Sequence, residues 1–522
     1  MNNFPLLMNK LTQLNRAIHA SCVPVSVPRR TIAAQTTALS SSLLTVTALA
    51  LFVLISGCTM APKYARPAVP IPGQWPAGSA YEKATPTNAP FAPDLNWRAF
   101  FADPKLQQVI GIALTNNRDL RLAALNVEFA RALYGIQRDQ LYPALTATAS
   151  AGKQRASTDL TQPGMPRTTE RYDVNLGVIS WEIDFFGRIR SLKDEALEKY
   201  LATEQARRSA QVLLISAVAN AYLALAADRE GLALAQETLN TQQTAYELVR
   251  KQYAAGVATE LDLRQAQTPV ESAKREVARY TQLVAQDENA LTLLAGGQLP
   301  AELLPSNLEQ AGSLSNVSPG LPSEVLLRRP DVLQAEGALK AANADIGAAR
   351  AAFFPRISLT TTLGTASRDL DGLFKAGTGT WSYAPQLVMP IFDARTWAAL
   401  KASKVQQKIA LTQYEKAIQN AFKDVADALA VRGTIGEQLA AQQALTDNLS
   451  ETYKLALSRY EKGIDSYLTV LDAQRSLFAA QQGLVSLRFA ELASRVRLYA
   501  ALGGGWENTD EAMTASVGTP AH

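Results

Sequence analysis

The chain has 522 residues, of which 47% are hydrophobic and only 7% aromatic, and its formal net charge is +4. The four surplus basic residues all precede position 58, and the remainder is neutral with 47 basic and 47 acidic residues, so nucleic-acid binding is not expected. Histidine occurs only at positions 19 and 522, and cysteine only at 22 and 58. Because these residues supply most acid–base catalysts and metal ligands, an enzyme is not expected, and neither a cofactor nor a bound metal is predicted.

The first 57 residues have the organisation of a lipoprotein signal peptide. Residues 43–55 form an apolar stretch of about 13 residues behind two arginines, which is too short to span a bilayer. The stretch leads into Ser56-Gly57-Cys58, which resembles a lipobox, so we expect cleavage after residue 57 and acylation of Cys58. The alternative is an incidental cysteine at a small-residue boundary, and the long leader is also consistent with a mis-assigned start codon.

The rest of the chain resembles itself at an offset of 207 to 212 residues. Leu141-Tyr142-Pro143 parallels Phe353-Phe354-Pro355, and the sequence YAAGV at 253–257 parallels YEKGI at 460–464. Two copies of one unit are therefore predicted. The expected organisation is an extended arm (58–100), a first repeat (101–298), a linking segment (299–322), a second repeat (323–506) and a disordered tail (507–522).

Each repeat contains two runs of alternating apolar residues around a polar loop. The runs cover residues 145–149 and 172–178 in the first repeat, and 357–363 and 381–387 in the second. Each pair predicts a β-hairpin with strands of roughly 10 residues, long enough to cross a bilayer at a tilt. A soluble hairpin would show the same alternation.

Long helices follow the hairpins. Residues 188–253 and 395–460 contain almost no proline and few glycines, and a helix of about 66 residues would be about 100 Å long. Gly256 and Gly463 predict a tight end to each, and a shorter helix then returns. Helices this long must pack laterally, as a coiled coil or a tube. The buried face of the first is expected to contain Val212, Leu213, Ile215, Val218, Tyr222 and Leu225.

The strand count predicts an oligomer. Four strands cannot close a barrel, and an open sheet edge in lipid would leave backbone groups without hydrogen bonds. Several chains would therefore share one barrel, which the long helices would extend as a tube. Aromatic residues near the strand ends are candidates for interfacial girdles: Tyr142, Trp181, Phe185, Phe354, Trp381 and Tyr383.

Several long motifs, in order, resemble the outer-membrane factors of tripartite efflux pumps. They are WEIDFFGR at 181–188, LRRPD at 327–331, AARAAFFP at 348–355, YLTVLDAQRSL at 467–477 and ALGGGW at 501–506. With the lipobox they resemble most the OprM/NodT-type lipoproteins, relatives of TolC. By resemblance to sorted lipoproteins, Thr59 after the cysteine favours the outer membrane.

The resemblance implies a mixed α and β membrane protein. The expected fold is a homotrimeric β-barrel, with four strands from each chain making twelve, continued by a periplasmic α-helical barrel. The implied partners are a periplasmic membrane-fusion adaptor and an inner-membrane transporter of the resistance-nodulation-division class. Drugs and other small toxic compounds would pass passively, with no energy conversion in this chain.

The resemblance also implies a periplasmic gate. In relatives, residues matching Leu468, Asp472 and Arg475 constrict the periplasmic tip, and their spacing here places all three on one helical face. The first repeat offers Leu261, Gln265 and Thr268 instead, so the second repeat is expected to carry the constriction. An outward-facing ion pair is the alternative. The tips around Tyr253, Gly256, Tyr460 and Gly463 are the expected adaptor contacts.

Two other functions fit parts of the sequence. A type I secretion channel for proteins would use a similar conduit, although the lipobox and the GGGW ending favour the small-molecule group. A lipid-anchored periplasmic coiled-coil scaffold would explain the anchor and the helices but leave the hairpins without a role. The neighbouring genes would distinguish a secretion channel from an efflux channel. Solubility in water after removal of the lipid would distinguish the scaffold from a channel.

Overall fold

The structure is a computed structural model, and it describes residues 59–82, 90 and 92–505. The chain divides into two units, residues 1–57 and 58–522, and all the described residues belong to the second. The predicted signal peptide, the acylated Cys58, Trp506 of the ALGGGW motif and the predicted tail lie outside the described residues.

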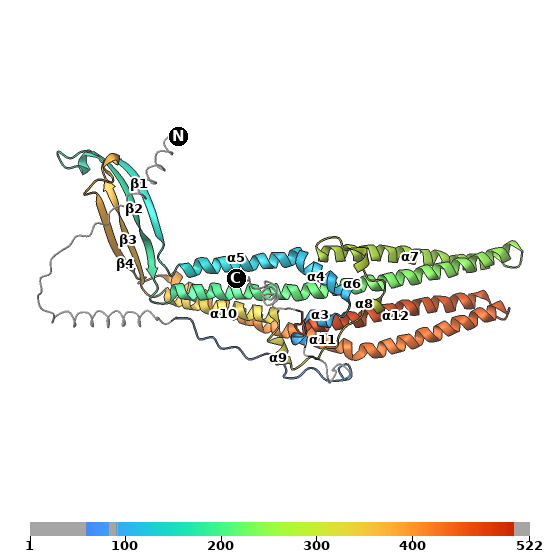
Figure 1. Cartoon of the computed structure of the whole chain (residues 1–522). Coiled ribbons are helices and arrows are strands. Elements are labelled where there is room, and N and C mark those ends of the chain that lie inside the picture. The colour runs from blue at the N-terminus through green and yellow to red at the C-terminus, as the bar shows by residue number, and fades with distance from the viewer. Residues whose placement is uncertain (1–58, 83–89, 91, 506–522) are drawn as a thin grey trace, which may run out of the picture. The chain divides into compact units, whose positions relative to one another are not determined.

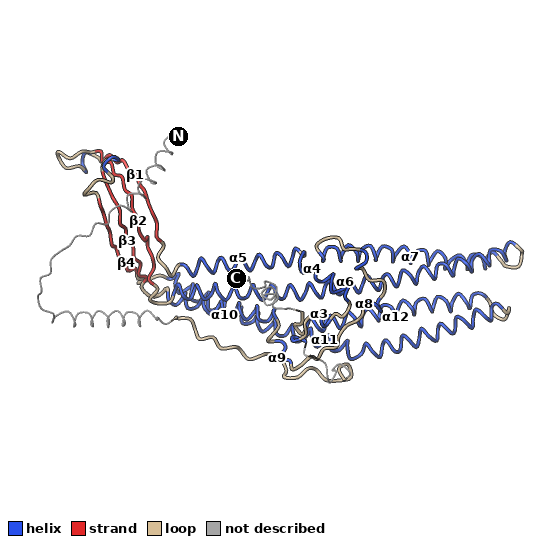
Figure 2. The backbone as a smooth tube through the Cα atoms, in the orientation of Figure 1, coloured by secondary structure: helices blue, strands red, loops and turns tan. Residues whose placement is uncertain are grey.

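Four strands form one antiparallel sheet in the order β1-β2-β3-β4 (Figure 2). The strands are β1 (Leu145–Arg155), β2 (Thr168–Ile183), β3 (Arg356–Ser367) and β4 (Gly379–Val388). The loops joining them at the far end contain the short helices η2 (Thr158–Leu160) and η4 (Leu370–Gly372). The two predicted hairpins are confirmed, and they are joined to each other by pairing between β2 and β3.

Each strand continues from a helix or leads into one. The helices next to the sheet are α5 (Arg118–Asp139), α6 (Arg188–Ala254), α10 (Pro330–Ala351) and α11 (Ala394–Glu461). Their neighbours are α5 with α6, α6 with α10, and α10 with α11. Strand order and helix order therefore agree, and β1 with α5 and β4 with α11 occupy the two free edges (Figure 1).

Away from the sheet, two helical hairpins extend in the same direction (Figure 1). The first consists of α6 with 67 residues and α7 (Glu260–Ala295), and the second of α11 with 68 residues and α12 (Tyr467–Ala501). The predicted long helices and their returning partners are thus confirmed to within two residues. The hairpins meet along α6 and α12.

Short helices surround the middle of the long ones. They are η1 (Ala92–Asp94), α3 (Trp97–Phe100), α4 (Pro104–Asn116), η3 (Ala301–Leu303), α8 (Leu308–Ala311) and α9 (Pro322–Leu326). The main core lies here, where Phe100 stacks on Tyr499 with ring centroids 4.0 Å apart. The buried face predicted for α6 is correct except at Leu213, which is 65% exposed. The buried neighbour is Leu214, because the helix turns 213 outward from a packed face centred on 215, 218 and 222.

The arm after residue 58 lies along the helices. Arg66 donates to both carboxylate oxygens of Glu336 on α10, at 3.2 and 2.6 Å, and Tyr64 donates to Oε1 at 3.1 Å. Burial alone would raise the pKa of Glu336, but the hydrogen bond from Arg66 and the charges of Lys340 and Arg66 lower it below its ordinary value. The arm is thereby fixed to α10.

Candidate functional site

One face of the sheet is apolar and uncovered. Residues directly opposite each other in an antiparallel pair share a face, so the register assigns the side chains. This apolar face includes Leu145 and Leu363, each 69% exposed, and Trp381, which is 78% exposed. Its other members are Ala147, Ala149, Ala151, Tyr172, Val174, Leu176, Val178, Trp181, Ile183, Ile357, Leu359, Thr361, Tyr383, Pro385 and Leu387. A face this apolar requires a nonaqueous neighbour.

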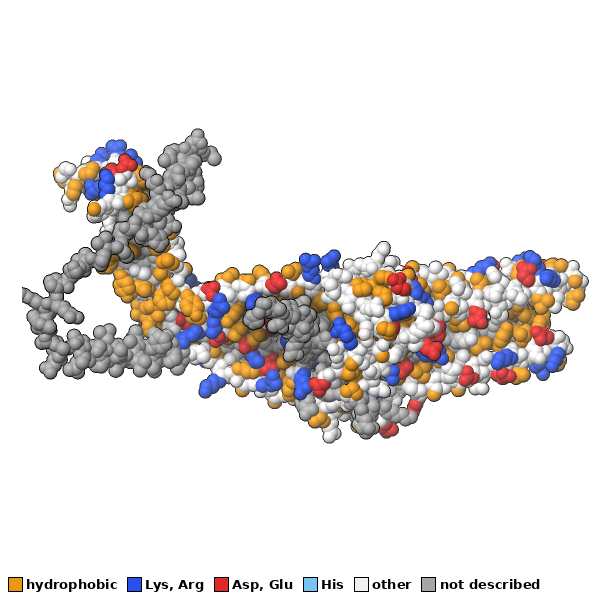
Figure 3. All heavy atoms as spheres, in the orientation of Figure 1, with side chains coloured by type: hydrophobic (Ala, Val, Ile, Leu, Met, Phe, Trp, Pro, Cys, Tyr) orange, Lys and Arg blue, Asp and Glu red, His pale blue; other side chains and the backbone are white. Residues whose placement is uncertain are grey.

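The opposite face is polar. Most of its residues carry a hydroxyl, an amide or a charge: Thr146, Thr148, Ser150, Gln154, Arg171, Asp173, Asn175, Glu182, Ser358, Thr360, Thr362, Thr380, Ser382 and Gln386. Thr362 and Ser382 hydroxyls lie 2.6 Å apart across two strands of this face. On the apolar face, a Lys153–Glu170 ion pair next to the far-end loop marks where the apolar residues end. Figure 3 shows hydrophobic side chains on the part of the sheet nearer the helices and charged ones at its far end.

A β-bulge keeps Trp181 on the apolar face. The register shifts between Val178 and Trp181, and Ser180 within the shift has a positive φ of 53°. Because β2 contains one extra residue here, Trp181 pairs with Leu359 and shares the face of Val178. Without the bulge, strict alternation would direct Trp181 toward the polar face. Alternation alone did not reveal this irregularity.

The aromatic residues predicted as girdles are mostly exposed. Tyr142 is 67% exposed, Phe185 45% and Phe354 42%, and all three lie at the end of the sheet where the helices begin. Trp381 lies toward the opposite end, whereas Tyr383 stands opposite Thr361 in the middle of its strand. The girdle itself stays a prediction.

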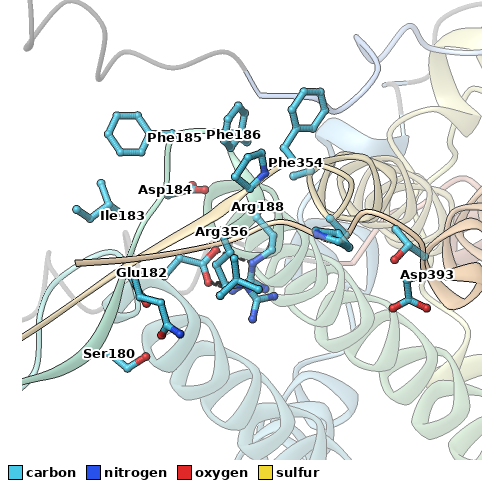
Figure 4. A pocket seen from close by; sticks show the side chains of 18 residues that line it. Ser180, Glu182, Ile183, Asp184, Phe185, Phe186, Arg188, Phe354, Arg356 and Asp393 are labelled. Carbon is cyan, nitrogen blue, oxygen red and sulfur yellow. Dashed lines mark hydrogen bonds and ion pairs between the residues drawn. The ribbon is translucent and has the colours of Figure 1, made fainter. Parts of the chain in front are cut away.

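Ion pairs fix the junction between strands and helices. Arg188 at the start of α6 donates to both oxygens of Glu182 at the end of β2, at 2.8 and 2.7 Å, and Arg356 of β3 approaches the same carboxylate at 3.3 Å. These groups line a cavity of about 530 Å³, and Figure 4 shows the three side chains pointing toward one another. The WEIDFFGR motif therefore joins a strand rigidly to the helix that continues it.

The two free edges of the molecule are apolar along their helices. On α5, large apolar side chains recur every three or four residues and are 47% to 64% exposed: Leu122, Leu125, Phe129, Leu133 and Ile136. We call this set the α5 stripe. On α11, Trp397, Val405 and Ile409 are also exposed. An apolar stripe of this kind on a helix normally faces another element.

The tips of both helical hairpins form the predicted glycine turns. Gly256 and Gly463 have φ of 76° and 74°, and each donates to the tyrosine three residues earlier. Tyr253 is 43% exposed, whereas the ring of Tyr460 lies 5.1 Å from that of Tyr467. Tyr460 also donates to Gln252 across the two tips, at 3.5 Å.

The structure places the predicted gate residues beside the residues at the corresponding positions of the first helical hairpin. Leu468, Asp472 and Arg475 lie on the first turns of α12, and Asp472 and Arg475 form an ion pair. Leu468 is 57% exposed, and the side chains of the ion pair are 64% and 81% exposed. Gln265 and Thr268 of α7 line the same cavity as these three residues, while Leu261 is exposed nearby on α7.

The comparisons with known proteins identify the family. The outer membrane efflux protein family matches the chain twice, over residues 109–297 and 321–504. The protein belongs to this family. It is 49% identical to the probable efflux pump outer membrane protein TtgC of Pseudomonas putida, over 90% of this chain and 97% of that one. The outer membrane protein OprJ of Pseudomonas aeruginosa is 41% identical, over 88% and 96%.

Solved structures of the family share the fold. The open state of the MtrE outer membrane channel of Neisseria gonorrhoeae has a TM-score of 0.78 and 39% identity, over 86% of this chain and 98% of that one. The CmeC channel of Campylobacter jejuni has a TM-score of 0.79 and 25% identity, over 88% and 98%. The predicted family, the efflux channel role and the outer-membrane location are confirmed.

Among the described helices, α6 alone contains a window long and apolar enough to cross a bilayer. Because 56% of that window is buried inside the molecule, it fits a packed core helix. The uncovered apolar face of the sheet is the stronger candidate for contact with lipid.

Proposed function

We propose that three copies of this chain form the outer-membrane channel of a tripartite efflux pump, and that each chain is two copies of one ancestral repeat. The channel receives small toxic compounds from a periplasmic adaptor and an inner-membrane transporter of the resistance-nodulation-division class. The names of similar proteins support this substrate class, because relatives from Pseudomonas putida are named for toluene efflux and for antibiotic efflux. Those names favour efflux over protein secretion.

The uncovered apolar face carries the proposal. In lipid, each backbone N–H and C=O needs a partner within the protein, yet β1 and β4 each pair on one side only. Pairing β4 of one copy with β1 of the next satisfies both edges. The apolar face then contacts lipid and the polar face lines the lumen. A scaffold without transport would leave this two-faced sheet unexplained.

The helices support the same closure. Because helix order follows strand order, joining β4 to β1 also brings α11 of one copy beside α5 of the next. The exposed α5 stripe and the exposed Trp397, Val405 and Ile409 of α11 are then buried against each other. Burial of apolar side chains contributes about 25 cal/mol per Å².

The anchor fits this arrangement. Thr59 lies 3.3 Å from Ser191 near the start of α6, and Arg350 at the end of α10 donates to the carbonyl of Met60 at 3.0 Å. The chain therefore reaches residue 59 at the junction of strands and helices, where a membrane surface is expected. Acyl chains on Cys58, one residue earlier, would enter the lipid there.

The tips supply the gate and the docking surface. Three copies of Asp472 and Arg475 around a threefold axis place alternating charges around the periplasmic entrance, with Leu468 as an apolar ring. The exposed turns at Gly256 and Gly463 then contact the adaptor. Arg475 holds the aspartate within its own chain here, and the same guanidinium is available to a neighbouring chain.

The proposal is tested through the α5 stripe. A strain without the gene should become sensitive to toluene and to antibiotics, and the wild-type gene should restore tolerance. Phe129→Glu with Leu133→Glu should abolish both heat-modifiable trimers and restored tolerance. Leu160→Glu, at a leucine that is 84% exposed in the β1–β2 loop, is the matched control and should retain both. Monomeric wild-type protein, or full tolerance with the stripe variant, would refute the assembly.

A further inference from the structure

A cavity of about 360 Å³ lies between the two helical hairpins near their tips. Its walls come from α6, α7 and α12, and we call it the tip cavity. Hydrogen bonds between the hairpins lie on either side of it along their length. Tyr460 donates to Gln252 toward the tips, and Gln482 donates to Tyr280 on the inner side at 3.4 Å. The volume is in the range of small-molecule sites.

The wall on α6 contains a hydrogen-bond acceptor without a partner. Gln242 is only 5% exposed, and its Oε1 makes no hydrogen bond among the described residues. A buried amide oxygen without a donor is costly, which makes such atoms uncommon in folded proteins. The terminal torsion of glutamine is soft, so this oxygen can meet a donor placed in the cavity.

The wall on α7 contains a second acceptor, created by a proline. Pro269 lies inside the helix and has no N–H, so the carbonyl of Gln265 loses the hydrogen bond that residue 269 would normally donate. Gln265 and Pro269 both line the tip cavity, which places the freed carbonyl on the cavity side of α7. Thr268 between them donates its hydroxyl to Arg264, at 3.0 Å, which leaves its oxygen as a further acceptor.

The remaining wall, on α12, combines the Asp472–Arg475 ion pair with apolar side chains. Asp472 offers Oδ2, since its contact with Arg475 is through Oδ1. Leu468, Leu471 and Phe478 supply apolar surface. The second acidic residue of the lining, Glu276, has both carboxylate oxygens engaged, by Arg275 and Arg279 at 2.7 and 2.8 Å, whereas Asp472 is engaged by Arg475 through one oxygen only.

We propose that the tip cavity binds a small amphiphile with a primary ammonium head and an apolar body. A primary ammonium has three N–H donors and no acceptor, and the cavity offers the amide of Gln242, the freed carbonyl of Gln265 and the carboxylate of Asp472. The apolar body packs against Leu468, Leu471 and Phe478. A ligand here bridges the first helical hairpin to the second, behind the residues of the proposed gate. Binding does not require that those residues form a gate.

The test uses the purified full-length protein in detergent. Phenethylammonium is titrated calorimetrically against a detergent blank, with 2-phenylethanol as a neutral probe of the same shape. Gln242→Leu removes the buried acceptor, and Pro269→Ala restores the N–H that engages Gln265. Neither change should impair folding, because each removes an unsatisfied group. Gln205→Leu is the matched control, since Gln205 is on the same helix with an equally unpartnered Oε1 but lies outside the cavity.

Saturable binding of phenethylammonium is expected, about tenfold weaker in Gln242→Leu and in Pro269→Ala and unchanged in Gln205→Leu. 2-Phenylethanol, with one donor, should bind more weakly than the ammonium. The inference is overturned if the wild type shows no saturable binding, or if Gln242→Leu and Gln205→Leu bind alike. Equal affinity for the alcohol would also overturn it, because the acceptors would then not recognise the head group.

Discussion

The two helical hairpins have the same scaffold but different side-chain chemistry. They are built from helices of 67 and 36 residues and of 68 and 35 residues. Both turn through a left-handed glycine with the same pair of backbone hydrogen bonds, since Val257 donates to Gln252 and Ile464 to Arg459, each at 2.9 Å. The two hairpins therefore have the same helix lengths, to within one residue, and the same turn.

Polar chemistry differs at corresponding positions. The second hairpin carries Asp472 and Arg475 where the first has Gln265 and Thr268. The first has Pro269 where the second has Ser476. The first also contains a half-buried carboxyl pair, Asp228 and Asp287, where the second has Ile435 and Ser494. The two helical hairpins therefore share a backbone but carry different polar side chains.

The largest effect is expected from the charged tip of the second hairpin. Asp472→Ala with Arg475→Ala should raise the leak conductance of the channel severalfold in planar bilayers, because the charges that hold the proposed constriction are removed. The measurement is single-channel current without partners. Gln265→Ala with Thr268→Ala makes the equivalent change in the first hairpin and should leave conductance near the wild-type value. Equal leaks from both double variants would mean that the hairpins do not differ in gating.

A second difference concerns pH. Burial and the neighbouring Asp228 carboxyl raise the pKa of Asp287 to about 7, well above the ordinary value for aspartate. A raised pKa means that the folded state holds the proton more tightly, so its stability contribution is full below about pH 4 and is lost as pH rises toward 7. Asp287→Asn should weaken this dependence.

The pH dependence of stability is measured as the melting temperature of the detergent-solubilised protein from pH 5 to 8. The wild type should lose thermal stability as pH rises through that interval, and Asp287→Asn should vary less. Ser494→Ala changes the corresponding position of the second hairpin and should keep the wild-type slope. The same slope in Asp287→Asn as in wild type would show that the carboxyl pair does not titrate there.

The scaffold was predictable from the sequence because its signals are local. Alternation of apolar residues located the strands, and Gly256 and Gly463 marked the ends of the long helices, since only glycine adopts positive φ without strain. Leu213 was assigned wrongly because an apolar run of four at 212–215 contains one more residue than the buried face accepts. The family followed from long motifs, which do not depend on geometry.

The polar sites were not predictable because they depend on distant partners. Glu182 meets Arg356 from the other repeat, and Glu336 meets Arg66 across 270 residues of sequence. Gln242 has no local feature that distinguishes it from the many other glutamines, and nothing near Pro269 in the sequence indicates a neighbouring cavity. Their common cavity appears only when α6, α7 and α12 are placed together.

A smaller effect should separate the two returning helices at their first residues. Thr259 caps α7 through a capping box, in which its hydroxyl accepts from the Asp262 N–H at 3.2 Å and the Asp262 carboxylate accepts from the Thr259 N–H at 2.8 Å. Ser466 at the same place before α12 makes no side-chain cap. Thr259→Ala should cost about 1 kcal/mol of stability and Ser466→Ala almost nothing, by chemical denaturation. Equal losses would contradict the capping difference.

The smallest effect is expected at the second tip itself. Arg459 donates to both oxygens of Asp465, at 2.6 and 2.9 Å, whereas the first hairpin has Gln252 and Ala258 there and forms the same backbone turn. Because solvent screens an exposed pair and the glycine turn forms without it, Arg459→Gln should leave the melting temperature unchanged. Weaker adaptor binding with unchanged melting would assign the pair to recognition. A clear drop in melting temperature would show that the second turn, unlike the first, depends on charge.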